Sequence, residues 1–211
     1  MIHVLFSLFA TFLLSTTSYV SAIDFCIADL KGAETPTGYP CKPPTKVTVD
    51  DFVFSKSTNT TPNNSFKSII SPAFVDQLPA LNGLGISIAN AELDEGGVVP
   101  LHSHADATEV IIVGQGNVIV GFISSTDNKV YVKKLSVGNI MVIPRGLLHF
   151  IINDGKGKAT GTFVFTSVRP SSQIIDLALF GNNFDSALLQ KTTFLDPAEI
   201  KRLKGIFKGS G

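Results

Sequence analysis

The sequence predicts an all-β fold, a sandwich or barrel, that ends in a short α-helical section. Short β-branched runs broken by Gly, Pro, Asn and Asp fill the middle of the chain, and helical spacing of apolar residues replaces them after Pro170. With 211 residues, of which 44% are hydrophobic, the chain is long enough for one domain with a substantial core.

The first 22 residues are expected to be a signal peptide. They contain no Asp, Glu, Lys or Arg, and an apolar run leads into Val20-Ser21-Ala22, after which we place the cleavage site. The alternative is an uncleaved membrane anchor, although the apolar run is shorter than the roughly 20 residues that a span requires. We therefore expect a mature chain of residues 23–211 that is secreted and has no stable membrane insertion.

Two features near the expected mature N-terminus suit an extracellular protein. Cys26 and Cys41 are the only cysteines, and in an oxidising compartment they are expected to form a disulfide rather than remain free thiols. Asn59 and Asn63 each begin a glycosylation sequon in a polar stretch that we expect to be an exposed loop.

The strands of the predicted barrel, placed at about residues 60–170, follow in order. Gly114-Gln115-Gly116 indicates a hairpin between two of them, and Thr126-Asp127-Asn128 indicates the next turn. We guess that the barrel interior is apolar, formed by Val110, Ile112, Met141, Ile143 and Phe150. Seven runs are predicted as strands: 85–93, 109–113, 117–122, 129–135, 140–143, 149–152 and 160–168.

The C-terminal section, at about residues 171–208, is predicted to be helical. Residues 171–180 and 185–190 are candidate helices. The clearest start is at Asp196, an N-cap residue followed by Pro197 at the first helical position and Glu199 in the first turn.

The charge balance excludes one class of partner. The chain carries 17 basic and 17 acidic residues, so its formal net charge is zero. No basic surplus exists to neutralise phosphates, and we expect no nucleic-acid binding.

Three of the four histidines gather in two short blocks with one glutamate. His102 and His104 are two residues apart, which on a strand places both imidazoles on one face. Glu109 follows a small polar turn, and His149 is expected to complete the set from across the barrel interior. Three imidazoles and a carboxylate suit a divalent first-row metal and leave two octahedral positions open.

Each of these residues also has a structural interpretation without a metal. A single histidine is more often a surface or core residue than a ligand, and the set could be a vestigial site. Glu109 argues against this, because a carboxylate that opens an apolar run is costly to bury without a partner cation.

The segments that contain these histidines and the glutamate resemble the motifs of a known family. Gly96-x5-His102-x-His104-x4-Glu109-x6-Gly116 and Gly138-x5-Pro144-x-Gly146-x2-His149-x3-Asn153 are similar to the two cupin motifs, with 21 residues between them. The N-terminal segments around both cysteines, and segments on to Asp196, resemble germin-like proteins, most of all those described as auxin-binding. Val137-Gly138-Asn139 departs from the basic-Gly-acidic tripeptide of many germins, which puts any adhesion role tied to it in doubt.

The resemblance implies a cupin β-jelly-roll barrel with manganese (Mn²⁺) held by His102, His104, Glu109 and His149. It also implies a Cys26–Cys41 disulfide and a homohexamer, a trimer of dimers held partly by the C-terminal helices, in the plant apoplast or cell wall.

The resemblance leaves several functions open. We rank metal binding first and superoxide dismutase activity second, with a role in defence or development. Binding of auxin or another carboxylate comes third, and oxalate oxidation last, because the guessed interior offers no polar groups to hold a dicarboxylate. A storage or wall protein without enzymatic activity is a further alternative.

Overall fold

The computed structural model describes residues 24–55 and 64–211. The predicted signal peptide (1–22) and both sequon asparagines, Asn59 and Asn63, lie outside these residues. Among the described residues, no helix is both long and apolar enough to span a membrane.

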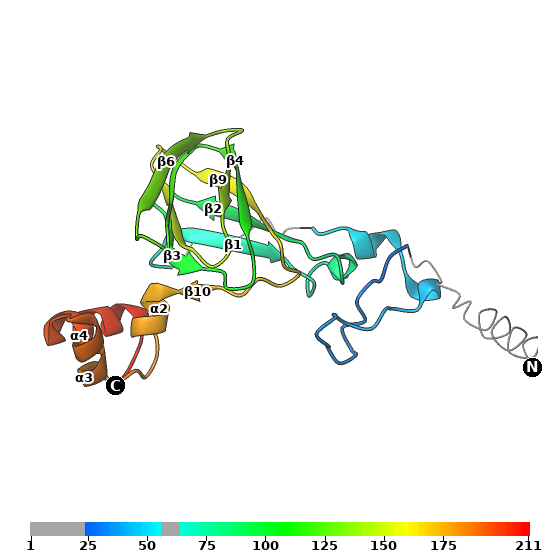
Figure 1. The fold of residues 1–211 in the computed structure, drawn as a ribbon. Helices are drawn as coiled ribbons and strands as arrows, with labels where there is room; N and C mark the ends of the chain where they lie inside the picture. Colours follow the sequence, from blue (N-terminus) through cyan, green and yellow to red (C-terminus); the bar gives the residue numbers. More distant parts are fainter. Residues whose placement is uncertain (1–23, 56–63) are drawn as a thin grey trace, which may run out of the picture.

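Two antiparallel sheets of five strands pack face to face, which confirms the predicted all-β jelly roll (Figure 1). One sheet has the order β1-β2-β9-β4-β7 and the other β10-β3-β8-β5-β6. The strands are β1 (Ser68–Ala73), β2 (Ser87–Leu93), β3 (Val98–Ser103), β4 (Glu109–Gln115), β5 (Asn117–Ile123), β6 (Val130–Ser136), β7 (Ile140–Ile143), β8 (Leu148–Asn153), β9 (Ala159–Phe165) and β10 (Gln173–Ile174).

Seven of these strands match predicted runs to within a few residues, and three were missed. β1 contains Pro72 and lies at the edge of its sheet, where a residue without an N–H is tolerated. β10 falls in the segment predicted to begin a helix at residue 171; that helix starts only at Ile175, because Gln173 and Ile174 pair with β3.

The inward faces differ in part from the sequence guess. On β4 the buried residues are Glu109, Ile111 and Val113, so Val110 and Ile112 point out of the barrel. Phe150 likewise alternates with the buried His149 and Ile151. The guess failed because β4 is apolar on both faces, which removes the alternation that identifies the inner one.

The space between the sheets is filled by one cluster of buried apolar side chains. Burial of each Ile, Val or Phe contributes about 1.5–3 kcal/mol relative to exposure. The cluster includes Ile111, Ile151 and Phe163, from β4, β8 and β9. This packing holds β4 opposite β8, which places the first residue of β4 near the site described below.

Three helices close the chain: α2 (Ile175–Phe180), α3 (Ser186–Thr193) and α4 (Pro197–Phe207). They lie together to one side of the barrel (Figure 1) around their own buried residues, Phe180, Leu189 and Ile200. Asp196 caps α4 as predicted, since its carboxylate accepts a hydrogen bond from the Ala198 N–H at 2.7 Å.

The N-terminal segment lies on the other side of the barrel (Figure 1) and contains the expected Cys26–Cys41 disulfide. It includes the 3₁₀ turns η1 (Pro44–Lys46) and η2 (Val49–Phe52), and it packs on a third, η3 (Pro79–Leu81), before β2. There the side chain of Asn82 accepts from the Tyr39 N–H and donates to its carbonyl, at 3.0 and 2.9 Å.

Candidate metal centre

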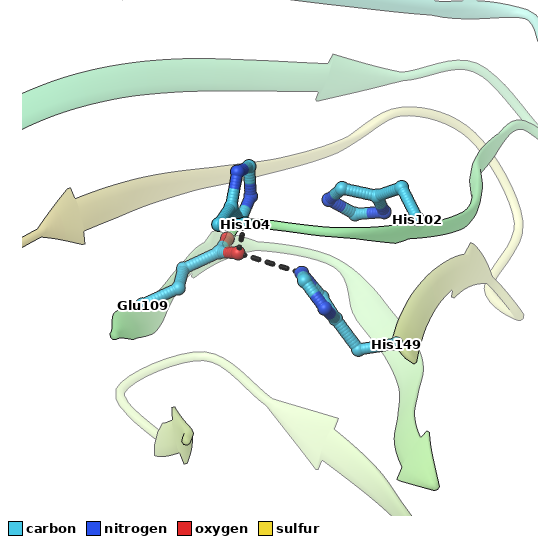
Figure 2. A group of neighbouring side chains, drawn as sticks. All are labelled: His102, His104, Glu109 and His149. Atoms are coloured by element: carbon cyan, nitrogen blue, oxygen red, sulfur yellow. Dashed lines mark hydrogen bonds and ion pairs between the residues drawn. The ribbon is translucent and has the colours of Figure 1, made fainter. Parts of the chain in front are cut away.

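The structure brings all four predicted ligand residues together inside one end of the barrel (Figure 2). One potential ligand atom from each lies within 4.8 Å of the others, and each side chain is buried. His102 is on β3 and pairs directly with His149 on the neighbouring strand β8. Glu109 opens β4 in the opposite sheet. Glu109, and not His149 as predicted, therefore reaches the group from across the barrel interior.

A β-bulge in β3 sets the phase of the histidines. Val99 pairs with Ile151 and His102 with His149, so β3 has one more residue than β8 between these pairs. The extra residue turns both Val99 and His102 inward, although they are three apart. His104 follows just beyond the end of β3 and is buried as well.

All three histidines are oriented in the same way. The Nδ1 atom of each lies within hydrogen-bond distance of a backbone carbonyl: His102 with Pro100 at 2.8 Å, His104 with Ser171 at 2.5 Å and His149 with Leu147 at 2.9 Å. A carbonyl oxygen can only accept, so Nδ1 must carry the hydrogen. The Nε2 atoms are then left to face the centre, as in metal-bound histidines.

Glu109 completes the set of donor atoms. Its Oε2 lies 2.8 Å from Nε2 of His149 and 3.2 Å from Nε2 of His104 (Figure 2). The carboxylate is 1% exposed, and its near partners are imidazoles whose other nitrogen already donates elsewhere. Four electron-pair donors thus converge on one point, an arrangement that fits a bound cation.

The electrostatics of the metal-free protein follow from burial and proximity. Burial, helped by the neighbouring His149, lowers the pKa of His102 to about 4. Burial alone would raise the pKa of Glu109, but its close contacts with His104 and His149 outweigh burial and lower that pKa to about 2. For His104 burial acts downward, and contact with Glu109 prevails and raises its pKa above the usual value.

The turn between His104 and Glu109 is fastened on both sides. From the loop before His149, the Gly146 N–H donates to the His104 carbonyl at 2.9 Å, and Arg145 Nε donates to Ala105 O at 3.0 Å. On the other side, Asp106 accepts hydrogen bonds from Ser167 and Ser171. Burial would raise the pKa of Asp106, but these bonds hold it below its usual range.

A cavity of about 320 Å³ opens beside the ligand atoms. Of the described residues that form its walls, most are apolar and none is Lys or Arg. The lining comprises His102, His104 and Glu109 with Ile70, Pro72, Phe74, Ala89, Val99, Phe163, Phe165, Pro170, Ser172 and Ile174. The cavity is therefore mostly apolar, as predicted for the barrel interior, but the residues that line it differ from those that were predicted.

Sequence reasoning missed the residues that support the ligands. Asp106 looked like part of a small polar turn, Ser167 like the end of a strand, and Ser171 like the start of a helix. Their contacts join segments more than 60 residues apart in the chain, which no local pattern reveals. The carbonyl groups that orient the imidazoles leave no trace in side-chain identity.

Comparison with known proteins adds three findings. A family model described as Cupin matches residues 55–201. The auxin-binding protein ABP19a of Prunus persica is 49% identical over 205 residues, 96% of this chain and 97% of that protein, and germin-like protein 1 of Brassica napus is 48% identical over 100% of both. A solved structure of recombinant oxalate oxidase in complex with glycolate has a TM-score of 0.82 at 33% identity, covering 88% of this chain and 96% of that one.

Proposed function

The chain belongs to the cupin family and, within it, to the germin-like proteins, and from this premise we propose that it is a secreted manganese-binding protein of the plant apoplast. The observation that carries the proposal is the convergence of three Nε2 atoms and one buried carboxylate on a single point. His102, His104, Glu109 and His149 would hold the ion. The choice of manganese rests on the resemblance to germin-like proteins, since the donor set itself suits several divalent metals.

The protein's own groups would prepare this site. The three backbone carbonyls fix the imidazoles in the tautomer that can bind a metal, and burial keeps His102 neutral well below pH 7. Glu109 would supply a negative charge that lowers the cost of bringing a divalent ion into the barrel.

Superoxide dismutation is the activity we propose for the loaded protein, with a role in defence or development. Bound manganese would supply one-electron redox chemistry, so that two superoxide ions and two protons give dioxygen and hydrogen peroxide. The cavity of about 320 Å³ beside the donor atoms would give a small molecule access to the metal.

Binding of auxin or another carboxylate is the second candidate, and the cavity favours it. A carboxylate could bind at the metal while its ring packs among Phe74, Phe163 and Phe165. Oxalate oxidation ranks below both. Among the described residues of the lining, Ser172 is the one polar side chain outside the ligand set, too few to hold a second carboxylate. A storage or wall protein would keep the metal for stability alone.

One experiment separates these functions. The protein is purified from an apoplast-like source, its metal content is measured, and superoxide and oxalate consumption are assayed with and without metal. Metal-dependent loss of superoxide supports the dismutase. Bound metal with neither activity but saturable auxin binding supports the binding protein, and metal with none of these supports the storage function. A native protein free of metal would refute the central proposal.

Assembly, secretion and modification form part of the proposal. We expect cleavage after residue 22, a single cupin domain over residues 23–211, glycans on Asn59 and Asn63, and a homohexamer built as a trimer of dimers. Mass spectrometry of the secreted protein would test the first three expectations, and light scattering the last.

A further inference from the structure

A short, partly exposed segment borders the metal centre. Residues 167–172, here called the strap, form all but the first residue of the connection between β9 and β10, and Ser171 and Ser172 within it are exposed. The strap is nevertheless in contact with the centre, because the Ser171 carbonyl lies 2.5 Å from Nδ1 of His104. Pro170 and Ser172 of the strap also line the cavity.

Asp106 fastens this strap to the turn between the ligands. Its Oδ1 accepts hydrogen bonds from the Ser171 N–H at 2.8 Å and from the Ser171 hydroxyl at 2.6 Å. Its Oδ2 accepts from the Ser167 hydroxyl at 2.8 Å. One carboxylate, two residues after His104, thus binds both ends of the segment that orients the His104 ring.

The middle of the strap has a separate anchor. Arg169 donates to Asp76, Glu34 and the Tyr39 hydroxyl, and this cluster joins the strap to the N-terminal segment. Loss of the Asp106 contacts would therefore free the end of the strap nearest His104 while Arg169 retains the rest. The effect is expected on the metal site more than on the fold.

We infer that Asp106 is a positioning residue for the metal centre: through Ser171 it fixes the orientation of His104 and keeps the strap closed over the cavity. This inference rests on the proposed metal-binding function. Partners that orient a ligand in this way commonly contribute 10- to 100-fold to metal affinity. Because Asp106 acts through a backbone carbonyl and not on the ring itself, we expect about 10-fold, the lower end of that range.

Two substitutions separate geometry from charge. Asp106→Ala removes all three acceptor contacts. Asp106→Asn keeps them, because its amide oxygen can still accept from Ser171 and its NH₂ group can donate to Ser167. Asp127→Ala is the matched control: Asp127 also accepts a hydrogen bond within a turn, from the Lys129 N–H, but lies away from the centre.

Mn²⁺ affinity and the electron paramagnetic resonance spectrum of bound Mn²⁺ are then measured on the full chain. Asp106→Asn creates an Asn-Ala-Thr sequon, so all variants come from a host without N-glycosylation. We expect Asp106→Ala to weaken affinity about 10-fold and to change the spectrum, with Asp106→Asn and Asp127→Ala close to wild type. Wild-type affinity and spectrum in Asp106→Ala, or an equal loss in Asp106→Asn, would overturn the inference.

Amide hydrogen exchange of residues 171–174 in the metal-free protein gives a readout independent of metal. Exchange should speed up in Asp106→Ala and stay slow in Asp106→Asn. Unchanged exchange in Asp106→Ala would show that Asp106 does not hold the strap in place. If wild-type protein bound no Mn²⁺, the proposed function would fail, and this measurement would still test whether Asp106 holds the strap in place. Should Asp106→Ala not fold, Ser171→Ala removes one of the three contacts and should cause smaller changes in the same direction. No change in Ser171→Ala would count against a role of Asp106 in holding the strap.

Discussion

At the scale of single residues, the centre combines groups that would be unfavourable separately. A buried carboxylate and three buried imidazoles cost free energy unless each finds a partner. The imidazoles find half of theirs in backbone carbonyls, through Nδ1. The three Nε2 atoms and the Glu109 carboxylate have mainly one another as polar partners, and a bound cation would satisfy all four groups at once.

Glu109→Gln should therefore abolish tight metal binding. The amide keeps the shape of the side chain but loses the charge, so we expect a larger loss of Mn²⁺ affinity than the roughly 10- to 100-fold typical of outer partners. Equilibrium dialysis followed by metal analysis measures the loss. Glu199→Gln on α4, where the carboxylate is surface-exposed and paired with Arg202, is the matched control. Equal metal content in the two variants would contradict the assignment of Glu109.

Metal affinity should fall as the pH falls. The raised pKa of His104 means that its ring keeps a proton to higher pH than a free imidazole, and a metal must displace that proton. His102, with a pKa of about 4, and Glu109, with a pKa of about 2, stay in their binding forms between pH 5 and 8. Isothermal titration in buffers of different ionisation enthalpy should show proton release on Mn²⁺ binding that grows as the pH is lowered from 8. An affinity independent of pH over this range would contradict the assignment.

At the scale of elements, loops and a bulge determine where the ligands meet. The bulge in β3 brings His102 inward opposite His149, and the loop before β8 holds the His104 carbonyl through the Gly146 N–H. Gly146 has a φ of +77°, a conformation that L-residues adopt only at a cost.

The same substitution should have opposite effects at two glycines. Gly146→Ala should lower the free energy of unfolding by about 1–2 kcal/mol, because a Cβ disfavours its positive φ even where space is open. Gly205→Ala on the exposed face of α4 should raise it by about 0.5–1 kcal/mol, because alanine is the better helix former. Urea unfolding of the metal-free variants measures both. Equal shifts of one sign would show that backbone conformation is not the cause.

The sequence was sufficient for elements with a local signal and not for the rest. Residues 117–122 and 140–143 are β-branched runs bounded by turn residues, and both were predicted as strands with nearly the observed bounds. β10 was mistaken for a helix because its two residues are held by pairing with β3, a contact 70 residues away in the chain. For the site, ligand identity was readable from His-x-His and the later Glu and His. Which strand faces which, and the role of Asp106, depended on tertiary contacts.

At the scale of the whole molecule, the sheet β1-β2-β9-β4-β7 is apolar on both faces at its β4-β7 end, whereas β2 carries Asn90 and Glu92 on the outer face. Its inner face forms the core, while Val110, Ile112 and Val164 point outward beside the exposed Ile140 and Val142. A sheet in water on one side would carry polar residues there. An outer face of this kind indicates coverage by another protein surface, in agreement with the proposed assembly of identical subunits.

Val142→Lys should accordingly disrupt the assembly. Val142 is 54% exposed in the single chain, so lysine there is harmless to the subunit but would place a charge in a covered apolar interface. Light scattering should show a smaller species than wild type, with Mn²⁺ affinity per subunit retained because the ligands lie inside the barrel. Val137→Lys is the matched control, since Val137 is 61% exposed in the turn between β6 and β7 and not on the sheet face. An unchanged mass for Val142→Lys, or an equal decrease in mass for Val137→Lys, would mean that the subunits meet elsewhere. The exposed side chains of the helical section, such as Leu188 and Phe194, would then be the next to substitute.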